Sequence, residues 1–258
     1  MYHFLVIIVN FFTSREKDYF YNPMNPKIIH IDGAQIRVSP DNIMLLLGES
    51  RDDPDPYTLG LVKHMTGECK RLMNPRGGYV IEVADGPRPT TEFKVRGTTF
   101  RPGRIISKEL EGAAMFAFFA GTAGAGPEEL SRSLLEEGRY LEGYIADLVA
   151  TAIVESVAEQ IYGHIIEEAS ARGMKSTNHY SPGHCNWSVE DQQGLFTLFP
   201  PGFCGIGLSA SSLMSPIKSV SGIVGIGRSV TYREYPCELC SMTGCSYRRT
   251  RELNARAR

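Results

Sequence analysis

The sequence has few cysteines for its length and little excess charge of either sign. Six cysteines in 258 residues are too few for a disulfide scaffold, and Cys237, Cys240 and Cys245 crowd together near the C-terminus. The 27 Lys and Arg against 29 Asp and Glu leave a net charge of −2, which argues against nucleic acid or an anionic membrane surface as the main partner. We therefore expect a cytoplasmic protein whose clustered cysteines have a metal or redox role.

Long hydrophobic runs and internal repeats are also lacking. The apolar run at residues 4–9 is too short to cross a membrane, and no Lys or Arg precedes it as a secretory signal would require. We expect this run to be a buried strand or to lie upstream of the true start, which would then be Met24, just before the first strand-like segment. We predict an N-terminal extension over residues 1–23, one domain over 24–235, and a tail rich in Cys and Arg over 236–258.

With 42% apolar residues the chain can bury a core, and its pattern changes near residue 105. Before that point, short apolar runs separated by turn residues predict strands and hairpins at residues 27–31, 36–38, 43–48, 78–83 and 92–95. After it, we predict a buried strand at 113–120, helices at 127–138, 139–171 and 189–199, irregular chain from 176, and an edge or curved strand within 208–227. The predicted fold class is α+β, a single domain with a curved, mostly antiparallel sheet packed against long helices.

The predicted helix over residues 139–171 is apolar on more than one face, which marks it as central to the fold. At about 100° per residue, Glu155 and Glu159 fall on one arc with Leu148 and Ala152. Acids on an apolar stripe are costly unless they are paired or face a polar cavity. Both are therefore candidate ligand contacts, with a rim position or a structural ion pair as the alternative.

A turn at Ser181, Pro182 and Gly183 lies between His179 and His184. Glycine lacks a Cβ, so backbone amides in this turn can approach a ligand closely. No signature of a catalytic cysteine surrounds the neighbouring Cys185. We interpret the two histidines as side chains that line a pocket, not as a metal pair or part of a nucleophile.

The cysteine cluster has the spacing of a possible metal site. Thiolates separated by two and four residues can converge on zinc or on an iron–sulfur cluster. Cys237, Cys240 and Cys245 are one ligand short of a closed site, which Cys185 or Cys204 would have to complete. A reversible disulfide pair and plain free thiols remain the alternatives.

Three segments together resemble the activation domain of cobalamin-dependent methionine synthase. That domain binds S-adenosylmethionine (AdoMet) and helps to remethylate an oxidised corrinoid in methionine biosynthesis. Residues 154–159 resemble its acid-bearing helix, Ser181 to Gly183 resemble its Arg-x-x-x-Gly-Tyr-Pro turn, and residues 208–222 resemble its strand ending in Ser-Val-Ser-Gly. The resemblance covers roughly residues 105–235.

The resemblance implies a set of cofactor-binding residues. Glu155 falls where the family's acid contacts AdoMet, Ser181, Pro182 and Gly183 where its backbone contacts lie, and Tyr232 where an aromatic contact lies. His179 stands where the family has an arginine and cannot form that residue's two parallel hydrogen bonds to a carboxylate. AdoMet binding would then be weaker, dependent on pH, supported by Lys175 or Arg172 instead, or lost.

The resemblance also implies a function in trans, because no folate, homocysteine or cobalamin domain accompanies the module. We expect a stand-alone component of a methyltransferase activity that needs no general acid or base. It would serve the cobalamin of a separate methionine synthase or corrinoid methyltransferase that lacks its own activation domain, with flavodoxin or ferredoxin as electron donor. The alternatives are a metal or iron–sulfur redox protein that delivers electrons to a corrinoid partner, and a scaffold subunit that has lost its ligand.

Overall fold

The computed structural model describes residues 25–49, 53–85, 91–237, 239–241 and 248, so the predicted extension over 1–23 and Cys245 lie outside the described residues. Its centre is a five-stranded sheet in the order β1-β2-β5-β9-β6, in which every neighbouring pair is antiparallel. The strands are β1 (Lys27–Ile29), β2 (Arg76–Val83), β5 (Met115–Thr122), β6 (Lys175–Tyr180) and β9 (Ser219–Gly227). The predicted α+β fold with an antiparallel sheet and long helices is confirmed.

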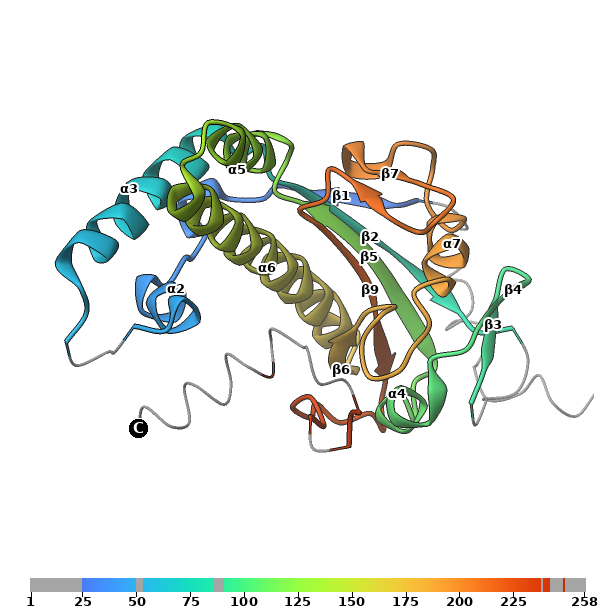
Figure 1. The fold of residues 1–258 in the computed structure, drawn as a ribbon. Coiled ribbons are helices and arrows are strands. Elements are labelled where there is room, and N and C mark those ends of the chain that lie inside the picture. Colours follow the sequence, from blue (N-terminus) through green and yellow to red (C-terminus); the bar gives the residue numbers. More distant parts are fainter. Residues whose placement is uncertain (1–24, 50–52, 86–90, 238, 242–247, 249–258) are drawn as a thin grey trace, which may run out of the picture.

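The two faces of this sheet are covered by different elements (Figure 1). One face carries the larger helices: α2 (Pro40–Leu47), α3 (Pro56–Leu72), α5 (Gly126–Glu136) and α6 (Tyr140–Ala171). The other carries short elements: β3 (Phe93–Val95), β4 (Thr98–Phe100), α4 (Gly103–Glu109), α7 (Asp191–Phe196), η2 (Phe203–Gly205), β7 (Gly207–Leu208) and β8 (Met214–Ser215). A short helix η1 (Gly33–Gln35) follows β1.

Strand β5 is buried on both sides, which explains its uninterrupted apolar sequence. Met115, Ala117 and Phe119 belong to the core beneath the large helices, whereas Phe116 and Phe118 belong to the core on the opposite face. A short continuous apolar run is typical of a strand covered on both faces. The prediction of a buried strand here is therefore confirmed.

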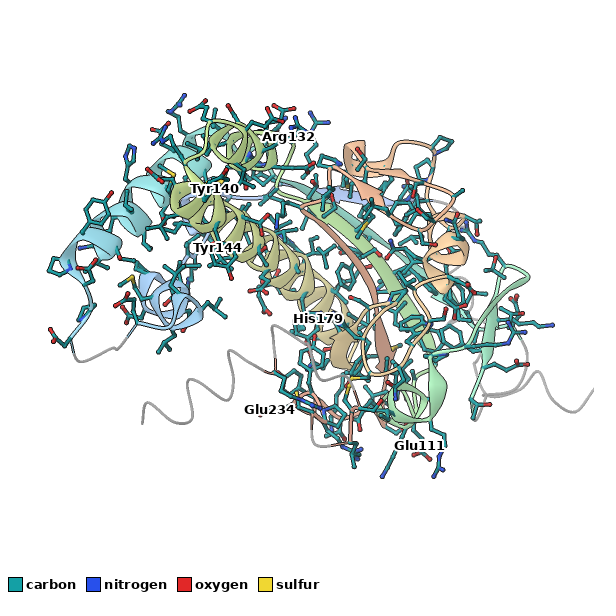
Figure 2. All side chains as sticks on the ribbon, viewed as in Figure 1. Glu111, Arg132, Tyr140, Tyr144, His179 and Glu234 are labelled. Carbon is teal, nitrogen blue, oxygen red and sulfur yellow. The ribbon has the colours of Figure 1, made fainter. Side chains whose placement is uncertain are left out.

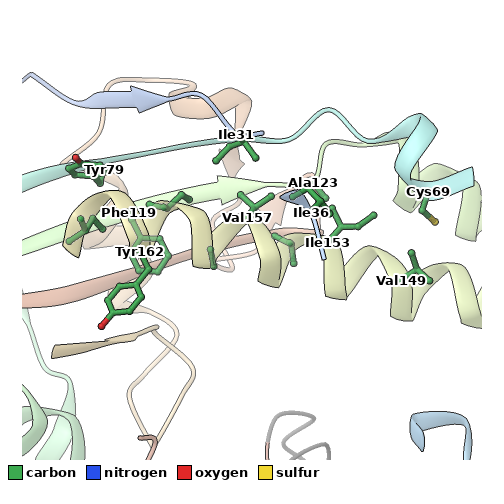
Figure 3. Packing of buried hydrophobic residues seen from close by; sticks show 14 of the residues in the cluster. Ile31, Ile36, Cys69, Tyr79, Phe119, Ala123, Val149, Ile153, Val157 and Tyr162 are labelled. Atoms are coloured by element: carbon green, nitrogen blue, oxygen red, sulfur yellow. The ribbon is translucent and has the colours of Figure 1, made fainter. Parts of the chain in front are cut away.

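Helix α6 lies across one face of the sheet and packs its buried side chains against it (Figures 1 and 3). The side chains that pack most deeply recur every four residues and are fully buried: Ile145, Val149, Ile153, Val157 and Ile161. The predicted helix over residues 139–171 agrees with the structure to within one residue. Despite this apolar character, none of the helices in the described part of the chain meets the length and hydropathy of a membrane span.

The prediction of strands and hairpins before residue 102 is wrong over residues 40–47 and 56–72, which form α2 and α3. Each helix begins with a capping side chain followed by proline. Ser39 accepts a hydrogen bond from the Asn42 amide, and Asp55 accepts one from the Thr58 amide. A cap followed by proline at the first helical position is a helix-start signal, and it outweighs the short apolar runs at 36–38 and 43–48.

Residues 208–227 are predicted to form an edge or curved strand with close neighbours, and the edge alternative is wrong. β9 is an interior strand between β5 and β6, and residues 207–215 form the separate β7-β8 hairpin. The close neighbours of β9 are confirmed: a Cβ built on Gly225 would lie 3.0 Å from the Ala113 Cβ. The chain from residue 176, predicted to be irregular, continues β6 as far as Tyr180.

Glycines let α6 approach the sheet closely. A Cβ on Gly77 of β2 would lie 2.7 Å from the Ile161 Cδ1, and one on Gly121 of β5 would lie 2.7 Å from the same atom and 2.9 Å from the Val157 Cγ1. Such distances are shorter than van der Waals contact, so α6 could not keep this position against larger residues. These two positions set the distance between helix and sheet.

We expect Gly121→Ala to lower the free energy of unfolding by about 1–3 kcal/mol, because the added methyl group overpacks the interface with α6. Gly163→Ala is the matched control on α6, where a Cβ meets nothing within 4 Å and alanine favours the helix by about 1 kcal/mol. Urea unfolding followed by circular dichroism measures both. An unchanged stability of Gly121→Ala would show that α6 shifts freely on the sheet.

Candidate functional site

His179 lies where the C-terminal half of α6, strand β6 and the chain after β9 meet (Figure 2). Its side chain is 16% exposed, and its Nε2 is 3.7 Å from the Glu159 Oε1. Its ring packs against Tyr162 of α6, with ring centroids 5.4 Å apart, and against the edges of Phe119 and Tyr235. The sequence-predicted His179 is thus the centre of a polar and aromatic cluster.

An irregularity in β6 sets the direction of this side chain. The pairing with β9 shifts register between Ser176 and His179, and the Thr177 hydroxyl accepts the Gly225 amide hydrogen in place of a carbonyl. The Asn178 side chain accepts the His179 amide hydrogen at 2.8 Å. The bulge therefore turns His179 toward α6 and leaves Tyr180 to the opposite core.

The Tyr235 hydroxyl holds the chain after β9 against His179. It donates to the His179 carbonyl at 2.8 Å, and the same oxygen lies 3.1 Å from Nδ1 and 3.4 Å from Nε2 of the ring.

The acids of α6 do not lie on its buried stripe, which corrects the expectation from the helical wheel. Glu155 is exposed, and the Glu159 side chain is 70% exposed. They share the least covered arc of the helix with Leu141, which is 41% exposed, while the opposite arc packs on the sheet. Of the alternatives considered, a rim position describes both acids.

The two carboxyl groups nevertheless have different electrostatic environments. Desolvation by surrounding protein atoms and the charge of Glu159 raise the pKa of Glu155 above its ordinary value. The neighbouring His179, whose Nε2 is 3.7 Å from the Glu159 Oε1, lowers the pKa of Glu159. Because both side chains reach solvent, screening limits these effects. The pair still places two neighbouring carboxyl groups on the open side of α6, with Glu159 beside His179.

The turn at Ser181, Pro182 and Gly183 follows β6 directly. Two backbone amides of this turn, which we expected to approach a ligand, are instead bonded within the turn. The Gly183 amide donates to the Trp187 carbonyl at 2.9 Å, and the His184 amide donates to the Ser181 carbonyl at 3.0 Å. Ser181 and Pro182 are buried. Gly183 has a φ of +95°, and nothing lies within 4 Å of the position a Cβ would take, so the space beside it is open.

Tyr232 and Tyr235 belong to the extended chain after β9, which runs beside β6. The Asn178 side chain donates to the Arg233 carbonyl at 3.1 Å and holds this segment in place. Tyr232 is 56% exposed and near enough to Tyr162 for the two phenols to interact electrostatically. Sequence reasoning did not find Tyr235, because its contact with His179 joins residues far apart in the chain.

The cationic residues that could replace the missing arginine differ in whether their charge is free to bind a carboxylate. Arg172 follows α6 and its guanidinium donates to the Glu168 Oε1 at 2.6 Å, so it is already engaged in an ion pair. Lys175 is exposed at the start of β6. His184 is exposed, and desolvation and the neighbouring His179 lower its pKa.

The cysteine cluster is only partly described. Cys237 and Cys240 flank a turn in which the Arg248 guanidinium donates to both of their carbonyls, whereas Cys245 lies outside the described residues. Among residues with described positions, no group of three or more His, Cys, Asp or Glu is arranged to hold a metal ion. Zinc or iron–sulfur ligation by Cys237, Cys240 and Cys245 stays a prediction.

The comparison with solved structures found a similar fold. The crystal structure of the MetH reactivation domain bound to AdoHcy matches this chain with a TM-score of 0.57. The match covers 83% of this chain and 82% of that one at 15% sequence identity, so it establishes the fold and not the function. No family model and no curated protein matches the sequence.

We expect an alkylating reagent to modify Cys237 and Cys240 before Cys69 and Cys204. Cys237 and Cys240 are half-buried, whereas burial raises the pKa of Cys69 to about 12 and that of Cys204 to about 11, which suppresses the reactive thiolate. A time course with iodoacetamide at mildly alkaline pH, followed by peptide mass spectrometry, measures each rate. Equal rates in the folded protein would contradict this order, and equal rates in urea are the control.

Proposed function

We propose that this protein binds AdoMet on the face formed by α6, His179 and the following turn, and presents it to the corrinoid of a separate protein. The observation that carries the proposal is the fold, which is similar over most of both chains to a reactivation domain with AdoHcy bound. The cluster around His179 adds chemical support, because it joins carboxylates, an imidazole and phenols beside open space.

The carboxylates suit the positive end of AdoMet, which carries an ammonium and a sulfonium group. Glu155 and Glu159 lie one helical turn apart, and the charge of Glu159 raises the pKa of Glu155. A cation between two such acids relieves their repulsion and gains attraction from both. In this proposal Glu155 holds the ammonium group, and Glu159 contributes its charge.

The carboxylate of AdoMet would lie toward His179. The ring is a weaker substitute for arginine, because it cannot form the two parallel hydrogen bonds of a guanidinium to a carboxylate. A ligand carboxylate would also compete with Glu159, whose Oε1 is 3.7 Å from the His179 Nε2.

The remaining predicted contacts would frame the ligand. The open position beside Gly183 leaves room for the ligand, and contacts from Ser181 and Pro182 would use groups other than the bonded amides of the turn. Tyr232 is exposed at the edge of the cluster and would cover the bound molecule. No general acid or base is required, since the residues position and neutralise charge.

The proposed reaction takes place on cobalamin held by the partner, a methionine synthase or methyltransferase without its own activation domain. One electron from flavodoxin or ferredoxin and the methyl group of AdoMet convert cob(II)alamin to methylcobalamin, and AdoHcy is released. Residues 24–235 would form the AdoMet-binding domain, and residues 236–258 would be a separate tail.

We expect Glu155→Ala to weaken AdoMet binding about tenfold, the loss of one charge-assisted contact. Isothermal titration calorimetry on the wild type and the variant measures it, and AdoMet should also raise the unfolding temperature of the wild type. Glu167→Ala, which removes another exposed acid of α6, is the control and should bind as the wild type does. If AdoMet produces no binding heat and no thermal stabilisation with the wild type, AdoMet binding is refuted.

His179→Arg is expected to strengthen AdoMet binding several-fold, because a guanidinium is always charged and can form two parallel hydrogen bonds to a carboxylate. Calorimetric titrations compare the variant with the wild type. His184→Arg is the control, since it adds the same charge in the neighbouring turn. Unchanged or weaker binding by His179→Arg would show that the carboxylate end of the ligand lies elsewhere.

A further inference from the structure

Cys237 and Cys240 have no part in the proposed AdoMet site, and the sequence leaves a metal site, a reversible disulfide and plain thiols open for them. They lie in the chain after β9, which runs beside β6 and α4 (Figure 1). The conformation of this segment determines how the two cysteines are held relative to each other.

The two cysteines form the ends of one tight turn. The Cys240 amide donates to the Cys237 carbonyl at 3.4 Å, which is the hydrogen bond between the first and fourth residues of a β-turn. Such a turn brings its end Cα atoms within about 7 Å of each other, and disulfides join Cα atoms about 4.4–6.8 Å apart. The backbone therefore places the two residues at a separation that a disulfide can bridge.

Arg248 holds this turn from outside it. Its Nη2 donates to the Cys237 carbonyl and to the Cys240 carbonyl, so a single guanidinium group joins the two residues. These hydrogen bonds are charge-assisted and therefore stronger than bonds between neutral groups. Because tethered groups react at an effective concentration set by how closely they are held, this contact favours reaction of the two thiols with each other.

The turn is also anchored to the folded core on both sides. Before the turn, the Tyr235 hydroxyl donates to the His179 carbonyl at 2.8 Å. After it, the Ser241 hydroxyl donates to the Asn186 side chain at 2.9 Å, and Cys240 packs against the core on the face opposite α6. The cysteine pair is thus part of a defined element of the fold.

The two thiols remain accessible to reagents in solution. Both are half-buried, whereas Cys69, Cys185 and Cys204 are buried. Thiol–disulfide exchange requires a thiol that a soluble disulfide can reach. Among the cysteines whose positions the structure describes, Cys237 and Cys240 alone combine such access with a second thiol in the same turn.

We propose that Cys237 and Cys240 are a redox-active dithiol, preorganised by Arg248, that exchanges with low-molecular-weight disulfides such as glutathione disulfide. One thiolate of the pair attacks a sulfur of glutathione disulfide, which forms a mixed disulfide and releases one glutathione thiolate. The other thiolate then attacks the protein sulfur of the mixed disulfide and releases the second glutathione. The pair loses two electrons and two protons, and one glutathione disulfide becomes two molecules of glutathione.

Glutathione buffers that range from reduced to oxidised test this proposal on the full chain in the absence of oxygen. Acid quenching, alkylation of the free thiols and peptide mass spectrometry identify each species. The wild type should form an intramolecular disulfide between Cys237 and Cys240 in a two-electron transition, while Cys69 and Cys204 stay reduced. Cys240→Ser should stop at a mixed disulfide between Cys237 and glutathione, because the second thiol is missing.

Further variants distinguish a preorganised pair from thiols that are merely close in sequence. Arg248→Ala should need about threefold more oxidised glutathione for half-oxidation, or more, because the turn is held less closely. Arg251→Ala removes the same charge from the tail and is the matched control, which should oxidise as the wild type does. Cys245→Ser, the control for the third cysteine of the cluster, should also behave as the wild type.

Four results would overturn the proposal. Three of them come from the same experiment: no disulfide in any buffer, a bond from either cysteine to Cys185 or Cys245, and equal oxidation of Arg248→Ala and the wild type. The fourth is stoichiometric zinc or iron in the purified protein that protects both thiols from oxidation, because it would assign the cysteines to a metal site. Elemental analysis measures this metal content. None of these outcomes depends on AdoMet binding.

Discussion

The close contact between α6 and a glycine-lined strip of the sheet is the constraint on which the rest of the structure depends. Gly77 and Gly121 leave no room for a Cβ beneath Ile161, so the helix lies as near to β2 and β5 as its own side chains permit. This position fixes where Glu155 and Glu159 stand relative to His179 on β6. The geometry of the candidate site therefore depends on the packing of α6 against the sheet, outside the site, as well as on the hydrogen bonds within it.

The elements that could be predicted are those whose hydrophobic pattern fits one type of secondary structure only. β5 is covered on both faces and α6 is too long and too apolar to be anything but a central helix, so both were found. The helices α2 and α3 were missed because short apolar runs between turn residues were given more weight than the caps at Ser39 and Asp55. The alternating small residues of β9 predict its close neighbours but do not distinguish an interior strand from an edge strand.

The candidate site was less predictable, for reasons that follow from its geometry. A helix that is apolar nearly all round does not reveal which arc faces the sheet, and the arc with Glu155 proved to be the open one. Turn chemistry predicted the bend at Gly183, but the amides of that bend are used by carbonyls of the same turn. Tyr235 reaches His179 only because the chain after β9 returns beside β6.

The returning segment also connects the two faces of the sheet. The ring of Tyr235 packs against His179, which faces α6, and against Tyr180, which belongs to the core on the opposite face. The Asn178 side chain fixes the segment through the Arg233 carbonyl. A ligand beside His179 would therefore press on a backbone that also contacts the opposite core, and this route bypasses the core beneath α6.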